Sequence, residues 1–130
     1  MEGYNWKHSE AAYHFGGMMA VYGAIQDAAM PGVNVNVVQR YYAAAMQSPA
    51  LVLGQLSRRS VHHLEMLGKG LAIIYLDYLR KLSLAAGDSI PQTLTLRQQS
   101  CFALGYYQMG AEMERQKREQ IARKKENKED

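Results

Sequence analysis

The chain has 130 residues, of which 48% are apolar, so it can form one domain with a core, and its composition excludes a disordered polymer. Its formal net charge of +3 favours anionic partners as a non-specific field effect. The single cysteine, Cys101, excludes an internal disulfide, and no apolar run approaches the roughly 20 residues that a bilayer requires. The segment Met1–Lys7 lacks the order of a signal peptide, so we expect a cytoplasmic protein without a membrane partner.

Two helices are predicted in the N-terminal third of the chain. Ser9 can cap a first helix that runs to about Met30, where Pro31 and Gly32 break it. Asn34 can cap a second helix in the same way. The apolar and aromatic residues of this second helix are Val37, Val38, Tyr41 and Tyr42.

The third predicted helix starts at Ser48 and Pro49, because serine is a good cap and proline is favoured at the first helical position. Gly68 and Gly70 either end this helix or only soften it before a fourth helical segment from residue 71 to about 86. The sequence leaves both possibilities open.

The last predicted helix opens at Thr95, which forms a capping-box pattern with Gln98, and it continues past Met113. No alternating β-branched stretch competes with the helical segments. The sequence therefore predicts an all-α fold, a compact bundle of about five helices, over residues 1–111. Residues 112–130 carry seven Lys or Arg and six Asp or Glu, which predicts a charged helical or disordered tail.

The third helix is predicted to have an apolar stripe and a cationic side. At about 100° per residue, one narrow arc that we expect in the core holds Leu53, Leu56, Ser60, Leu64, Leu67 and Leu71. The opposite side holds Arg58, His62 and Lys69 with Glu65 nearby, and the residues on one flank of the stripe are Arg59 and His63. We define a cationic ridge as Arg58, Arg59, His62 and Lys69, to which neighbouring helices can add Arg40, Arg80 and Lys81.

The fourth segment is apolar on two faces. One stripe consists of Leu71, Ile74, Tyr75, Tyr78 and Leu82. The residues that point the other way are Ile73, Leu76 and Leu84. A helix of this kind is either central in a bundle or covered by another protein, and the sequence leaves that choice open.

The stretch Phe102–Tyr107 places Gly105 inside a helical apolar pattern, where glycine costs about 1 kcal/mol relative to alanine. The residues that share one face of this helix are Phe102, Tyr106, Met109, Gly110 and Met113. We interpret the stretch as a core and helix-packing signature, and we expect Gly110 to let a neighbouring helix approach closely.

Motifs for catalysis are weak. His62 and Glu65 have the spacing of two metal ligands on one helix face, but a di-metal bundle needs several inward carboxylates. Cys101 lacks an orienting group or an oxyanion loop, and Gly16 and Gly17 lie in a helical run where close packing explains them. We expect no enzyme, no metal, no cofactor and no small-molecule substrate.

Scattered Arg and Lys on a helix surface usually serve only solvation, and the charge pattern of the cationic ridge does not by itself decide between solvation and nucleic-acid binding. Binding is supported by the local excess of these cations over the single neighbouring Glu65. Its spacing matches no base-reading module, so contact with the phosphate backbone is the most that these residues support. The tyrosines could stack on unpaired bases, but most of the nine fall on apolar stripes, where core packing is the favoured role.

Three blocks of the sequence resemble a known family, over roughly residues 9 to 110. The run LTLRQQSCFALGYY, Leu94–Tyr107, resembles the closing signature of the type I-C CRISPR large-subunit family. The start of that family's C-terminal helical region looks like Ala12–Val21 followed by Ile25 and Gln26. Its middle is similar to Arg40–Ala45, Ser48–Ala50 and His62–Leu64.

A chain with only this helical region resembles the small subunit of the type I-C surveillance complex, Cascade, which in that family is made from an internal start within the large-subunit gene. The resemblance implies an all-α bundle without catalysis, present in more than one copy along the belly of the complex. The partners implied are the large subunit, the crRNA-bearing backbone subunits, further copies of the chain and target DNA. Its role would be to hold the displaced non-target strand and the crRNA–DNA duplex. The alternative is a purely structural helical module that contacts only proteins.

Overall fold

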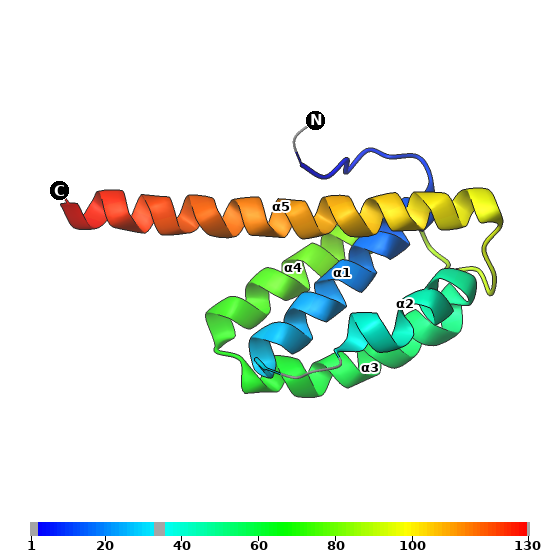
Figure 1. The fold of residues 1–130 in the computed structure, drawn as a ribbon, viewed down its shortest axis with the longest axis horizontal. Helices are drawn as coiled ribbons and strands as arrows, with labels where there is room; N and C mark the ends of the chain where they lie inside the picture. The colour runs from blue at the N-terminus through cyan, green and yellow to red at the C-terminus, as the bar shows by residue number, and fades with distance from the viewer. Residues whose placement is uncertain (1–2, 33–35, 130) are drawn as a thin grey trace.

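The computed structural model describes residues 3–32 and 36–129. This part of the chain folds into five helices without a strand, which confirms the predicted all-α bundle (Figure 1). In chain order they are α1 (Ala11–Ala29), α2 (Val37–Gln47), α3 (Pro49–Met66), α4 (Lys69–Ala86) and α5 (Leu96–Glu129). None of the described helices is long and apolar enough to cross a membrane.

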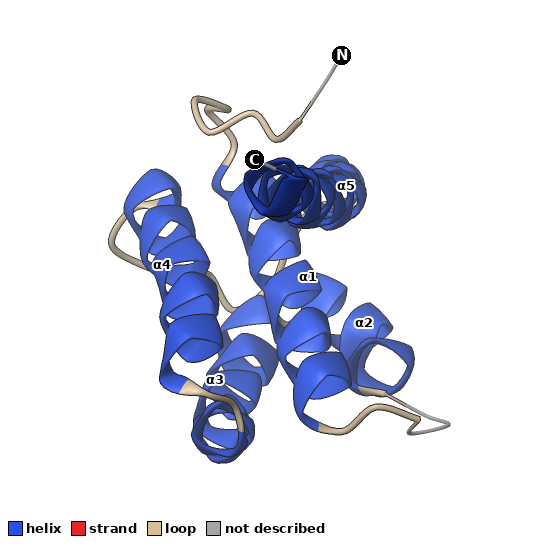
Figure 2. Ribbon diagram, turned by 90° about the vertical axis from the view of Figure 1, so that its left-hand side faces the viewer, coloured by secondary structure: helices blue, strands red, loops and turns tan. Residues whose placement is uncertain are grey.

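The first helix, α1, is the centre of the bundle. It contacts each of the other four helices, and Figure 2 shows it between α4 on one side and α2 on the other. Nearly all of α1 from Ala12 to Ile25 is buried, because its alanine, methionine and aromatic side chains face neighbours in every direction. Of the two possibilities for α4, a central position is therefore wrong: α4 packs on α1 and leaves its outer face uncovered.

The contact between α1 and α5 depends on two glycines. A Cβ atom on Gly16 would lie 1.9 Å from the carbonyl oxygen of Phe102, and one on Gly105 would lie 1.8 Å from that of Tyr13. No side chain fits at either position, because the two helix backbones touch there. The stretch Phe102–Tyr107 is thus a packing element, as the sequence indicates. The expectation for Gly110 is wrong, since a Cβ there would meet no described atom within 4 Å.

The capping predictions have mixed outcomes. Thr95 and Gln98 form the predicted capping box, in which the Gln98 amide donates to Thr95 Oγ1 at 3.2 Å and the Thr95 amide donates to Gln98 Oε1 at 2.8 Å. Ser9 is not a cap, because α1 begins after Glu10 and has no side-chain cap. The predicted cap Asn34 lies outside the described residues, and α2 instead begins after Asn36, which forms a capping box with Gln39.

The chain leaves helical geometry between α3 and α4. Leu67 and Gly68 both have extended backbones, with ψ values of 157° and 154°, so the third helix ends before Gly68 rather than being softened there, and Gly70 lies inside α4. Consequently Lys69 and Leu71 belong to α4, and their placement on the wheel of the third helix is wrong. The earlier part of the stripe is buried as expected, at Leu53, Leu56 and Ser60.

The last helix, α5, is 34 residues long and continues without a break through residue 111, the end of the predicted bundle domain (Figure 1). Its contacts with the body also extend past that point. The buried Glu112 carboxylate accepts a hydrogen bond from the Tyr4 amide at 3.1 Å, and Gln116 Oε1 accepts one from the Tyr78 hydroxyl. From Lys117 to Asn127 the side chains are exposed.

A buried polar cluster fixes the N-terminal segment to α1. Nδ1 of His14 lies 2.8 Å from the Tyr4 hydroxyl oxygen, and Nε2 of His14 lies 2.9 Å from the His8 carbonyl oxygen. The ring of His8 stacks on that of Tyr13 with centroids 4.1 Å apart. Burial lowers the pKa of His14, so the cluster is built around a neutral imidazole.

Candidate nucleic-acid interface

The cationic residues of α3 project into solvent because the other side of that helix is in the core. Arg58, Arg59 and His62 are exposed, whereas Leu56 and Ser60 on the same two turns are buried. The separation follows from helical periodicity, which places residues three and four apart on one face. The amphipathic pattern of this helix is as the sequence predicts.

The structure brings two of these arginines together with a tyrosine from α2. A guanidinium nitrogen of Arg59 donates to the Tyr41 hydroxyl oxygen at 2.6 Å, and its guanidinium carbon lies 5.4 Å from the centroid of the Tyr41 ring. Around them is an open hollow of about 420 Å³. We define the α2–α3 patch as its lining residues, Tyr41, Gln55, Leu56, Arg58 and Arg59.

The cations of this region lack carboxylate partners within the described residues. The ion pairs among the described residues involve only Asp77, Glu112 and Glu119 as acids, and none includes Arg40, Arg58 or Arg59. Arg40 is exposed on α2, next to Tyr41 in the chain. Unneutralised guanidinium groups can form two parallel hydrogen bonds to a phosphate, so the patch is chemically suited to an anionic backbone.

The other predicted site residues lie apart from the patch. Arg80 and Lys81 of α4 pair with Asp77 at 2.9 Å and 3.2 Å, and α4 lies across α1 from α2 (Figure 2). Lys81 also lies 5.9 Å from the centroid of the Trp6 ring. Lys69 is the exposed first residue of α4 rather than part of α3. The seven predicted residues therefore do not form one continuous surface.

The histidines and the cysteine of the weak catalytic motifs lie in ordinary structural surroundings. Among residues 3–32 and 36–129, no three His, Cys, Asp or Glu side chains are grouped so that they could hold a metal ion. Burial, together with the neighbouring His62 and Arg59, lowers the pKa of His63. Cys101 is half-buried and packs against the core.

Sequence reasoning missed the role of Tyr41. From the sequence, this tyrosine is only one of the apolar and aromatic residues of the second helix, and its partner Arg59 is on the next helix. Since the contact depends on how α2 and α3 pack, no spacing rule within one helix could have found it. The available signal was weaker: a tyrosine placed directly after Arg40 on an exposed part of α2.

The fold and this surface define an all-α helical bundle whose candidate interface is an arginine-rich patch. Residues 4–113 match the family described as CRISPR-associated protein (Cas_Csd1). Because the match covers most of the chain, the protein belongs to this family. No curated protein matches the chain.

Proposed function

We propose that the chain is the non-catalytic small subunit of a type I-C RNA-guided surveillance complex, in which it helps to hold the R-loop. Membership of a CRISPR-associated family supports a role in such a complex. Strand pairing with the guide RNA supplies sequence choice in these assemblies, so a subunit of this kind needs only sequence-independent contacts. Its partners are then the large subunit, the backbone subunits, further copies of the chain and the displaced non-target DNA strand.

The observation that carries the nucleic-acid part of the proposal is the α2–α3 patch. Arg58 and Arg59 are exposed and have no described carboxylate within 4.0 Å, so they can pair with phosphates without first breaking an ion pair. The Tyr41 ring beside them offers an aromatic surface on which an unpaired base can stack. Arg40, the exposed residue before Tyr41 on α2, is a further cation that would extend the contact along the strand.

The direct test uses the full chain and a labelled oligothymidine of about 20 nucleotides, at low and at moderate salt. Replacing Arg58→Glu with Arg59→Glu should weaken binding at least about tenfold, because two phosphate contacts become repulsive. The matched control is Arg80→Glu with Lys81→Glu, which changes the net charge equally but alters cations already paired with Asp77. Equal weakening by both pairs would refute the patch assignment.

A specific observation also favours the alternative, a purely structural module that contacts proteins alone. On the outer face of α4 the side chains of Ile73, Leu76 and Leu84 are 64%, 49% and 72% exposed. A group of exposed apolar side chains of this kind is typical of a surface that contacts another protein. If the unaltered chain fails to bind the oligothymidine even at low salt, this alternative replaces the nucleic-acid role. The same face can serve subunit contacts under the main proposal.

A further inference from the structure

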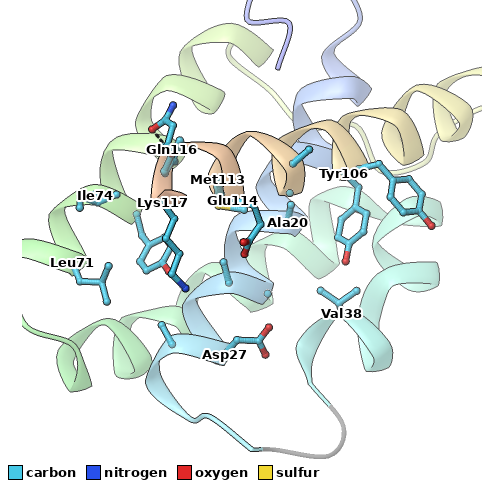
Figure 3. A pocket seen from close by; sticks show the side chains of 18 of the residues that line it. Ala20, Asp27, Val38, Leu71, Ile74, Tyr106, Met113, Glu114, Gln116 and Lys117 are labelled. Atoms are coloured by element: carbon cyan, nitrogen blue, oxygen red, sulfur yellow. Dashed lines mark hydrogen bonds between the residues drawn. The ribbon is translucent and has the colours of Figure 1, made fainter. Parts of the chain in front are cut away.

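A groove of about 650 Å³ lies over the C-terminal half of α1 (Figure 3). It shares no lining residue with the α2–α3 patch. Its floor consists of small residues spaced along α1, namely Ala20, Gly23, Ala24 and Ala28. Its walls come from α4, α5 and the start of α2. The larger apolar side chains of these walls include Leu71, Ile74, Tyr75, Tyr106 and Met113.

The groove is acidic although the chain as a whole is basic. Asp27 of α1 and Glu114 of α5 both line it, and Figure 3 shows them extending into the same space, with Lys117 on the α5 side. Within the described residues neither carboxylate takes part in an ion pair. Burial first, and then these two carboxylates, raises the pKa of the Tyr75 hydroxyl, which also lines the groove.

The shape and chemistry of the groove favour a helix as its occupant. A peptide bound as a β-strand would need a sheet edge to satisfy its backbone hydrogen bonds, and the described chain has no strand. A helix satisfies its backbone internally and can approach closely over the alanines of α1. The floor from Ala20 to Ala28 is about 12 Å long at the helical rise, enough for two turns of contact.

We propose that this groove binds an amphipathic α-helix of a partner protein, one whose apolar stripe is flanked by Lys or Arg. The apolar stripe covers Leu71 and Ile74, and the flanking cations meet Asp27 and Glu114. This inference does not depend on the nucleic-acid role of the α2–α3 patch. Nucleic acid is a poor occupant, because the two carboxylates outnumber the single ammonium group of Lys117 and leave the groove with a net negative charge that repels phosphates.

Two exposed parts of a second copy, the outer face of α4 and the end of α5, match the groove poorly. On the outer face of α4 the cations Arg80 and Lys81 are already paired with Asp77. From Lys117 to Asn127, α5 exposes only one large apolar side chain, Ile121. The observations therefore favour a helix from a different protein.

The test compares two synthetic helical peptides of about 18 residues that share one leucine stripe and differ only in lysine or glutamate flanks. The lysine peptide should bind about tenfold tighter than the glutamate peptide, since it can form two partly buried charge pairs. Amide chemical shifts should change along residues 20–28 of α1 and the facing parts of α4 and α5. Replacing Ala24→Leu should weaken both peptides, because it fills the floor.

Charge reversal makes the test specific. Asp27→Lys with Glu114→Lys should invert the peptide preference, and a lysine at position 27 suits the last turn of α1. Glu65→Lys, an exposed acid on α3, is the control and should leave the preference unchanged. Several results would overturn the proposal: no binding of the lysine peptide at about 1 mM, equal affinity for both peptides, self-association that fills the groove, or oligothymidine shifting the same amides.

Discussion

The α2–α3 patch and the groove between α4 and α5 rest on the same central helix but have opposite chemistry. The patch presents two arginines without described acidic partners beside a half-buried tyrosine, in an open hollow. The groove presents a small-residue floor, apolar walls and two carboxylates. Under the two proposals above, this difference corresponds to a division of labour within a chain of 130 residues, with an anionic partner on one surface and a helical protein partner on the other. Variants can distinguish the functions of the two surfaces only if the core that supports both stays folded.

The largest effect is expected at the α1–α5 contact, because both surfaces depend on it. Gly105→Ala should lower the free energy of unfolding by about 3 kcal/mol or more, since its Cβ would lie 1.8 Å from the Tyr13 carbonyl oxygen. Gly110→Ala is the matched control and should be neutral or stabilising by up to about 1 kcal/mol. Urea denaturation followed by circular dichroism measures both. Similar stability of the two variants would show that the helices do not touch at Gly105.

The next largest effect concerns the buried cluster that joins the N-terminal segment to the core. Glu112→Ala should cost about 1–3 kcal/mol, because the Tyr4 amide and Gln116 lose their acceptor. Thermal unfolding of the variant measures the loss, and Glu119→Ala, on the exposed part of α5, should change stability by less than about 0.5 kcal/mol.

Acid should weaken the same cluster. Burial lowers the pKa of His14, so its contribution to stability is present above the unfolded value of about 6.5 and is lost as pH falls below it. Burial opposes ionisation of Glu112, but hydrogen bonds from Gln116, Tyr4 and Arg115 outweigh it and lower its pKa, which adds a loss near and below pH 4.5. Unfolding midpoints measured from pH 7 to pH 4 should therefore fall, and His14→Gln should flatten the upper part of that curve. A curve of unchanged shape in the variant would contradict this assignment.

A smaller effect is expected from the hydroxyl of Tyr41. Tyr41→Phe keeps the ring but removes the acceptor for Arg59, so oligothymidine binding should weaken by about two- to fivefold. Tyr41→Ala should weaken it further, because the stacking surface is lost as well. Fluorescence anisotropy with the two variants separates these contributions, and peptide binding in the groove should stay constant in both. If Tyr41→Ala binds as the unaltered chain does, the patch does not use its aromatic ring.

The smallest effect on stability is expected on the outer face of α4. Ile73→Glu with Leu84→Glu should change the unfolding free energy by less than about 1 kcal/mol, because both side chains are largely exposed. The same variant should be retained less well by a co-expressed CRISPR-associated complex if this face meets a subunit. Full retention would show that the face is not part of an interface.

Local sequence rules predicted the helices better than they predicted the surfaces. The capping box at Thr95 is encoded within a few residues, so it could be predicted from the sequence. The glycines at positions 68 and 70 marked a possible helix end, but the sequence left open whether the helix stops there. Gly105 and Gly16 could each be interpreted as packing glycines, but their pairing could not be predicted, since it arises from the crossing of two helices. The same reason hid the Tyr41–Arg59 contact and the acidic groove. Lys69 was misplaced because the wheel was continued past the end of α3.

The salt dependence of single-stranded DNA binding tests the central claim most directly. If Arg58 and Arg59 each contact a phosphate, Arg58→Ala with Arg59→Ala should reduce the slope of log affinity against log salt by about 1.4, while Arg80→Ala with Lys81→Ala should leave it nearly unchanged. An unchanged slope in the Arg58 and Arg59 variant, or an equal reduction in both, would contradict the assignment of nucleic-acid binding to the α2–α3 patch.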